Sequence, residues 1–389
     1  MDTLKLEAFR EIIASDPKLT EGINPIIFDE CIAPASWTLP SHASLFTGMG
    51  QSEHNCHETK EIKSLDIERI RLTERTIADD MHRAGYTTYG ISANPYISPV
   101  YGFDFDKYFE ESYFTDVFGS VIEVSKELKP KISKYRNAYG ADLTGMAKAV
   151  ALEDPKLFLD IAISATMLTP VAAAKKAKAK LIDGWPIEKG GKRILERIRS
   201  MRFKRPFFLF VNLMEAHDPY IGKKGMDFNW ATPFLKSQPS NETIERWKQL
   251  YRKASHRSIR YGIDIIRDLI SRFGNDQIIV LTSDHGQAFN ERGFIGHGTV
   301  LFDETIKVPL AVIIPKRFSR EKQKGRQSLM NIRGFVNAAI KGDEDALRLL
   351  TKDKAEAEAF SIPANISNVK GLDRRKIRLF DRYTKRVFE

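Results

Sequence analysis

An apolar run that ends in a polar tetrapeptide constrains the fold of this chain more than any other feature. Residues 278–281 are continuously apolar, and Ser283-Asp284-His285-Gly286 follow directly after Thr282. An apolar run without alternation is typical of a strand that helices bury on both faces. In open α/β sheets, ligands gather beyond the carboxyl ends of such strands. Carboxylate and imidazole suit Zn, Mn or Fe, so Asp284 and His285 predict a metal site in an α/β fold.

A second stretch, residues 31–48, presents a hydroxyl group at the start of a predicted helix. Its core is Thr38-Leu39-Pro40-Ser41-His42, and the apolar run after it ends at Gly48. Proline is tolerated in the first helical turn, and glycine is a natural helix stop. A helix N-terminus carries unpaired N–H donors that favour anions. We therefore expect Thr38 to face an anionic substrate, although the same pattern also fits a simple helix cap.

These two stretches and a third together resemble the sulfatase family of the alkaline-phosphatase superfamily. The first two contribute T-L-P-S-H-A-S-L-F-T-G and S-D-H-G-Q…G-H-G…L-F-D-E-T…V-P-L. The third, F-F-L-F-V-N-L-M-E-A-H-D-P-Y at residues 207–220, is similar to the family's strand that ends in D/E-x-H-x-P-Y. All three occur in the family's order and span residues 1 to about 315.

The resemblance implies an α/β fold, a three-layer α/β/α sandwich with a mixed, mostly parallel central sheet. We expect residues 1–316 to form this catalytic domain, interrupted by a helical insertion at 111–200. Residues 317–389 should form a basic, mostly helical C-terminal portion. Met1-Asp2-Thr3-Leu4-Lys5 resembles the segment that follows the family's first central strand, but the strand itself is missing. An upstream start of translation is the interpretation that we favour.

The resemblance also implies the residues of the site. A divalent metal ion (Zn, Mn, Ca or Mg) would be bound at one site, and a second site stays open. Glu215 shares a face with His217 if the strand continues that far, so the two could bind a second ion with His297. The expected metal ligands are Asp2, Thr38, Asp284 and His285, and the catalytic residues are Thr38, His217 and His297. The expected substrate-binding residues are His42 and Asn94. Asn94 is included because it lies just past a predicted strand end, where it could line the pocket or form a turn before Pro95. His42 could orient Thr38, contact the substrate or lie on the helix surface.

The departure from the family lies at Thr38. Sulfatases that use formylglycine carry Cys or Ser within C/S-x-P-x-R, whereas this chain has Thr38 and His42 at the first and last of these positions. Threonine has no matching route to the aldehyde, and Cys31 lies outside the motif. A direct threonine alkoxide instead resembles the phosphodiesterases and phosphonate hydrolases of the superfamily.

The charge and composition of the chain limit the classes of binding partner that we expect. The net charge of +10 favours anionic partners, such as small esters, acidic polymers or membrane surfaces. No recognised nucleic-acid motif accompanies the charge, so we expect no specific nucleic acid. Two cysteines without metal spacing, no signal peptide and no transmembrane stretch favour a cytoplasmic location. Basic runs such as residues 374–386 are read as solvated faces.

Three functions follow from these observations. The first is metal-dependent hydrolysis of sulfate or phosphate esters, with Thr38 as the nucleophile. The second is a phosphodiesterase or phosphotransferase that acts on lipid or glycan head groups. The third is a catalytically silent sulfatase-like protein that binds anionic polymers through its basic charge. The substrate would in each case be an anionic ester, a sulfated or phosphorylated glycan or lipid.

Overall fold

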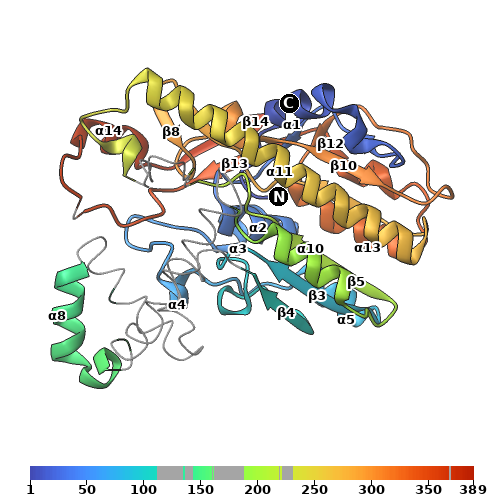
Figure 1. Cartoon of the computed structure of the whole chain (residues 1–389), viewed down its shortest axis with the longest axis horizontal. Coiled ribbons are helices and arrows are strands. Elements are labelled where there is room, and N and C mark those ends of the chain that lie inside the picture. The colour runs from blue at the N-terminus through green and yellow to red at the C-terminus, as the bar shows by residue number, and fades with distance from the viewer. Residues whose placement is uncertain are drawn as a thin grey trace.

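The computed structural model (Figure 1) describes residues 1–111, 135, 143–159, 161, 188–218, 220, 231–367 and 369–389. Most of the predicted insertion at 111–200 therefore lies outside the described residues. Its described part includes helix α8 (Leu143–Glu153), which projects away from the sheets in Figure 1. Among the described helices, none has the length and apolar character needed to cross a membrane.

Two three-stranded sheets form the centre of the molecule. In the first, β3 (Thr87–Ser92) lies between β4 (Lys107–Glu110) and β5 (Phe207–Asn212), and all pairs are parallel. In the second, β10 (Leu310–Ile313) lies between β1 (Ile26–Ile27) and β6 (Ile279–Thr282), and all pairs are antiparallel. β6 occurs at the apolar run of residues 278–281 and β5 within the 207–220 segment, where the sequence predicts strands. The expected α/β fold is confirmed, with strand pairs of both kinds.

Residues 1–3 connect the two sheets at the carboxyl ends of β5 and β6. The amide of Asp2 donates to the carbonyl of Leu213 just past β5, and the amide of Asp284 just past β6 donates to the carbonyl of Met1. Within the described part of the chain, β5 is an edge strand of the first sheet and β6 is an edge strand of the second. This connection brings Asp2 to the ends of both sheets, where the sequence predicts the metal site.

Alternate residues of the central strands pack into different hydrophobic clusters, which produces the three layers. Phe208, Phe210 and Val280 pack against the cluster that includes residues of α2, α5 and α13. Leu209 and Leu281 instead join clusters with residues of α10 and α11. Because side chains of a strand alternate between its faces, helices must cover both faces of the sheets. The helices are α1 (Leu6–Ser15), α2 (Thr38–Thr47), α5 (Ile77–Arg83), α10 (Gly191–Ser200), α11 (Asn241–Phe273) and α13 (Ile332–Ile340).

The C-terminal portion, residues 317–389, is less helical than the sequence predicts and packs into the same core. Besides α13 and α14 (Arg374–Phe380), it contains β11 (Arg326–Gln327), β12 (Thr351–Lys352), β13 (Ala355–Ala359) and β14 (Thr384–Phe388). Leu329 and Phe335 belong to the cluster that also contains Leu39 of α2. The remaining short elements are α3 (Gln51–His54), α4 (Ile67–Ile70), α12 (Asp303–Ile306), β2 (Cys31–Ile32), β7 (Ala288–Glu291), β8 (Phe294–Gly296) and β9 (Lys307–Val308).

A buried carboxyl group ties this C-terminal portion to the loop before Thr38. Glu58 accepts hydrogen bonds from the indole N–H of Trp37 at 2.7 Å and from the amide of Ser361 at 3.2 Å. Its side chain is fully buried, and burial raises its pKa from the ordinary 4.5 to about 7, although these N–H donors favour the charged form. The hydrogen bonds through which Glu58 holds the loop before Thr38 therefore depend on its protonation, which changes near pH 7.

We expect Glu58→Gln to flatten the pH dependence of stability. The folded state holds the Glu58 proton more tightly than the unfolded chain does. Its contribution is therefore complete below pH 4.5 and is lost as the pH rises through about 7. Between those values the free energy of unfolding should fall by about 3 kcal/mol more in the unmodified protein than in Glu58→Gln. Urea unfolding at both ends of the range measures this. The exposed Glu61→Gln is the control, and an equal slope in Glu58→Gln and the unmodified protein would contradict the assignment.

Candidate active site and metal centre

Thr38 is the first residue of α2, as the sequence predicts. Trp37 precedes the helix in extended conformation, and the helix ends at Gly48, whose φ of 72° suits glycine. The Thr38 side chain is buried among polar groups. Its Oγ1 lies 3.3 Å from Nε2 of His285 and 3.3 Å from Nδ2 of Asn94. The hydroxyl group thus lies at a helix N-terminus and in contact with residues from two other segments.

Asp2, Asp284 and His285 form a buried group whose potential ligand atoms lie within 4.8 Å of one another. Nε2 of His285 is 3.7 Å from Oδ1 of Asp2 and 3.5 Å from Oδ2 of Asp284. Nδ1 of His285 lies 2.9 Å from the carbonyl of Gly286, which can only accept, so Nδ1 carries the proton and donates. In the neutral ring this leaves the Nε2 lone pair toward the two carboxylates and Thr38.

Several contacts outside this group fix its position. The hydroxyl of Ser41 donates to the carbonyl of Asp284 at 2.6 Å, which holds the Asp284 segment against α2. Thr3 adopts a φ of 61°, an uncommon value for a β-branched residue. Its amide donates to Oδ1 of Asp284, and its carbonyl accepts from the hydroxyl of Tyr251 on α11. The long helix α11 therefore helps to hold the turn that follows Asp2.

The two predicted substrate-binding residues both contact Thr38, in different ways. Nδ2 of Asn94 donates to Oδ2 of Asp2 at 2.8 Å as well as to the Thr38 hydroxyl. His42 is 4% exposed, and its Nδ1 lies 2.9 Å from the carbonyl of Thr38 and 3.5 Å from Oδ2 of Asp284. Asn94 thus bridges the hydroxyl and a carboxylate, whereas His42 packs beside them.

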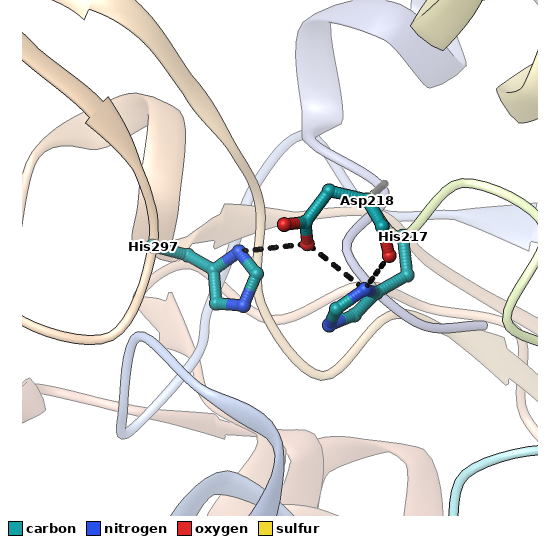
Figure 2. Close-up of side chains that lie close together, drawn as sticks. All are labelled: His217, Asp218 and His297. Carbon is teal, nitrogen blue, oxygen red and sulfur yellow. Dashed lines mark hydrogen bonds and ion pairs between the residues drawn. The ribbon is translucent and has the colours of Figure 1, made fainter. Parts of the chain in front are cut away.

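His217, Asp218 and His297 form a second group of possible ligands. Figure 2 shows the Asp218 carboxylate between the two imidazole rings. Nδ1 of His217 lies 2.9 Å from Oδ1 of Asp218, and Nδ1 of His297 lies 4.0 Å from the same oxygen. Nδ1 of His297 also contacts Oε1 of Gln287 at 2.6 Å. Oxygen acceptors therefore orient both rings through Nδ1.

Charges in this second group divide the roles of its histidines. Burial lowers the pKa of His217, but Asp218 and Asp2 outweigh burial and raise it to about 9. Burial raises the pKa of Asp218, but His217 outweighs burial and lowers it to about 2. Burial and the neighbouring His285 keep the pKa of His297 well below its usual range. Without a bound cation, His217 is the proton-carrying ring and His297 the neutral one.

The two groups adjoin. The ring centroids of His285 and His297 are 4.5 Å apart, and those of His217 and His297 are 4.9 Å apart. Burial raises the pKa of Asp2, but the charges of His217 and His285 and its hydrogen bonds outweigh burial and lower it. Residues from four separate parts of the chain therefore share one electrostatic environment at the carboxyl ends of the two sheets.

Glu215 does not take the place that the sequence suggests for it. Its Oε1 accepts from the amides of Lys189 at 2.9 Å and Gly191 at 3.0 Å, at the N-terminus of α10. The carboxylate therefore stabilises the start of a helix, where negative charge is favourable. Asp218 supplies the carboxylate of the second group instead. The sequence could have indicated Asp218, because Asp218 directly follows the predicted catalytic residue His217.

Lys189 is a further residue that the sequence did not point to. Its side chain is 2% exposed, and its ammonium group donates to the carbonyls of His217 and, at 3.4 Å, Glu215. Burial lowers its pKa to about 8, although Glu215 and Asp218 act in the opposite direction. The Lys189 side chain therefore holds the turn that carries His217 and Asp218.

We expect Lys189→Met to lower the free energy of unfolding by about 3 kcal/mol. The substitution removes the donor from two carbonyl groups, and it removes a positive charge that opposes the burial-raised pKa of Glu215. Urea unfolding measures the effect. Lys192→Met is the matched control, because Lys192 is three residues further along, exposed in the first turn of α10. Equal losses in both variants would contradict the role of Lys189.

The residues present fit a divalent cation. Oδ2 of Asp284 is buried and has no hydrogen-bond partner among the described residues, although a buried polar oxygen needs a partner. Two carboxylates and an imidazole nitrogen converge there with a hydroxyl beside them, and this donor set suits Zn, Mn or Mg. The orientation of His285 by the Gly286 carbonyl is the usual outer support of a metal-binding histidine.

Solved structures share this fold at low sequence identity. A 2-O GAG sulfatase matches with a TM-score of 0.54 and 11% identity, covering 94% of this chain and 77% of its own. A phosphonate monoester hydrolase from Silicibacter pomeroyi matches with a TM-score of 0.50 and 14% identity, covering 92% and 78%. The C-terminal periplasmic domain of EptC from Escherichia coli, solved in complex with Zn, matches with a TM-score of 0.51 and 11% identity, covering 96% and 89%.

At these identities the structural matches establish the fold alone. No curated protein matches the sequence. The family model described as Sulfatase, however, matches residues 6–336, which is most of the chain and includes Thr38, the His217 segment and the Asp284–His297 segment. On this evidence, together with the fold, the chain belongs to the sulfatase family.

Proposed function

We propose that the protein is a metal-dependent hydrolase of phosphate or sulfate esters in which Thr38 is the nucleophile. One observation carries the proposal. The Thr38 hydroxyl lies at the N-terminus of α2 and 3.3 Å from His285 of the buried Asp2-Asp284-His285 group. A nucleophilic oxygen, a binding site for positive charge and N–H donors for an anion thus meet at one place.

The first group would hold one divalent ion through Asp2, Asp284 and His285, with the Thr38 hydroxyl as the fourth ligand. The second group, His217, Asp218 and His297, would hold a second ion or the oxygens of the ester. A bound cation would lower the pKa of the Thr38 hydroxyl and neutralise charge on the transferring group. Asn94 and His42 would position the Thr38 hydroxyl and Asp284.

The protein's own groups account for the rest of the reaction. Oγ1 of Thr38 would release its proton to solvent and form a bond to phosphorus or sulfur, while the bond from that atom to the leaving oxygen breaks. His217, whose pKa is raised to about 9, would donate its proton to the leaving oxygen. A water oxygen would then bond to phosphorus or sulfur as the bond to Oγ1 breaks; one proton of the water would pass to Oγ1, and solvent would restore the proton of His217. The N–H donors at the start of α2 would stabilise charge on the non-bridging oxygens.

Phosphate esters are the substrates that we favour over sulfate esters. The site has threonine where formylglycine enzymes need cysteine or serine, and His42 stands where they have arginine. His42 is engaged with Thr38 and Asp284, so it cannot readily turn to a sulfate group. The same chemistry with an alcohol in place of water would be a phosphotransfer to or from a lipid or glycan head group.

The test is a panel of aryl phosphate monoesters, phosphodiesters and sulfates, assayed with added Zn, Mn, Mg or Ca. The proposal expects metal-dependent turnover of at least one phosphate ester. Faster turnover of the aryl sulfate with unmodified Thr38 would reverse the preference for phosphate. Absence of turnover with every ester and metal, in a protein that binds anionic polymers, would favour a catalytically silent binding protein.

A further inference from the structure

Helix α14 presents a group of cations that the rest of the described chain leaves uncompensated. Arg375 and Arg378 are exposed, and they lie on one face because they are three residues apart. No ion pair links either of them to a described carboxylate, whereas the nearby Arg386 pairs with Asp303 and Lys385 with Glu356. We name this group, Arg374, Arg375, Arg378 and Arg382, the α14 basic surface.

The acidic residues at the ends of α14 are engaged elsewhere. Asp373 accepts from the amides of Arg375 and Lys376 at the helix start. Asp381 accepts from the hydroxyl of Ser361 and the amide of Ile362. Their charges therefore serve the local backbone, and the arginines extend toward solvent without a carboxylate partner among the described residues. Charge of this kind attracts an anionic surface.

Apolar side chains are exposed within the same surface. Leu379 is 52% exposed and lies four residues from Arg375, on the same face of the helix, and Tyr383 is 51% exposed just beyond it. With Val387, they account for three of the seven large apolar side chains that are exposed in the described chain. Arginines and an apolar side chain that share one exposed helix face are the combination that binds the surface of an anionic membrane.

The opposite face of α14 anchors this surface to the body of the protein. Ile377 and Phe380 pack into a cluster with Phe234 and Phe294. The ring centroids of Phe294 and Phe380 are 5.1 Å apart. Phe294 begins β8, and His297 follows β8 directly. The α14 basic surface is therefore rigidly connected to the segment that carries a residue of the candidate active site.

We infer that the α14 basic surface docks the protein on a membrane that contains anionic lipids. The arginines would contact lipid phosphates, while Leu379 would enter the interface between head groups and acyl chains. Tyr383 would border the interface through the exposed part of its ring, because its hydroxyl donates to Glu358. An acidic polymer would satisfy the arginines equally well but would not cover the exposed leucine, so the apolar side chains favour the lipid surface. The inference does not depend on the proposed catalytic activity.

The experiment measures binding of the full chain to phosphatidylcholine vesicles with and without phosphatidylglycerol, by co-sedimentation. We expect binding only to vesicles with phosphatidylglycerol, weakened by salt. Arg375→Glu/Arg378→Glu should weaken it at least about tenfold, because each cation near the surface contributes to attraction. The control is Lys316→Glu/Lys324→Glu, which makes the same change of charge at exposed positions elsewhere.

Leu379→Ser separates docking on a membrane from attraction to any polyanion. The substitution should weaken binding to mixed vesicles roughly tenfold and leave heparin binding unchanged. Three results would overturn the inference: no binding to mixed vesicles, equal loss in the control pair, or vesicle binding that does not depend on Leu379. Heparin binding without vesicle binding would likewise overturn it and make the surface a polyanion site. The variants change only exposed side chains, and a melting curve for each confirms the fold.

Discussion

Thr38→Ala is expected to abolish turnover of every ester that the unmodified protein hydrolyses, with a loss of at least about 10³-fold in kcat. The substitution removes the oxygen that forms the covalent bond, but it leaves the helix start intact because alanine is compatible with the first turn of α2. Metal content should fall only modestly, because Asp2, Asp284 and His285 remain. Steady-state kinetics on the phosphate panel measure the loss.

Thr38→Ser is the matched control for this result. Serine keeps the hydroxyl and loses one methyl group, so the nucleophile stays while the fixed side-chain orientation of a β-branched residue is relaxed. We expect Thr38→Ser to retain measurable activity that Thr38→Ala lacks. Comparable activity in the alanine variant and the unmodified protein would show that Thr38 is not the nucleophile.

Asp284→Asn has the second large expected effect, a loss of metal together with activity. Asp284 contributes a buried oxygen that has no hydrogen-bond partner within the described part of the chain, and an amide in its place cannot supply a carboxylate ligand. Metal affinity should fall more than about 100-fold, because loss of a direct ligand should exceed the effect of removing an outer-shell partner. Metal content after dialysis, by atomic emission, measures the change.

The stability of the metal-free protein distinguishes loss of a ligand from loss of the fold. Asp2 and Asp284 are both buried and lie close together, so two carboxylates repel each other there when no cation is bound. Asp284→Asn reduces this repulsion, and the variant should unfold in urea no earlier than the unmodified metal-free protein. A large loss of stability in the metal-free state would show that Asp284 supports the fold rather than a cation.

The residues that local sequence patterns specify were predictable. Asp284 and His285 follow an apolar run, and Thr38 stands before Pro40 at the start of a helix, so strand-end and helix-start rules place them without tertiary information. Asp2 was added through the family resemblance, and Asn94 through its place just past a predicted strand end. The structure brings all five together because the ends of β3, β5 and β6 meet the start of α2.

The strand pattern did not predict the position of Glu215 correctly. Its predicted partnership with His217 assumed that the strand alternation continues to residue 217, but β5 ends at Asn212. The amide of His217 donates to the carbonyl of Met214, so these residues form a turn. In a turn the alternation of faces no longer applies, and Glu215 points to the start of α10.

The supporting residues could not be predicted, because their partners are far away in the sequence. Tyr251 holds residue 3 across an interval of 248 residues, and Glu58 contacts Ser361 across 303. Lys189 is bonded to main-chain carbonyls, which leave no signature in the side chains of the sequence. Such contacts depend on how α10, α11 and the C-terminal portion pack on the sheets, and no local period encodes that packing.

The most direct test of the central claim is to trap the covalent ester on Thr38. The protein would be mixed with the best phosphate ester of the panel in the presence of metal, quenched in acid within the first turnover, and analysed by intact mass and peptide mapping. The account predicts one added phosphoryl group on the peptide that contains Thr38, and none in Thr38→Ala. Turnover that proceeds with no adduct at any quench time, or an adduct on another residue, would contradict it.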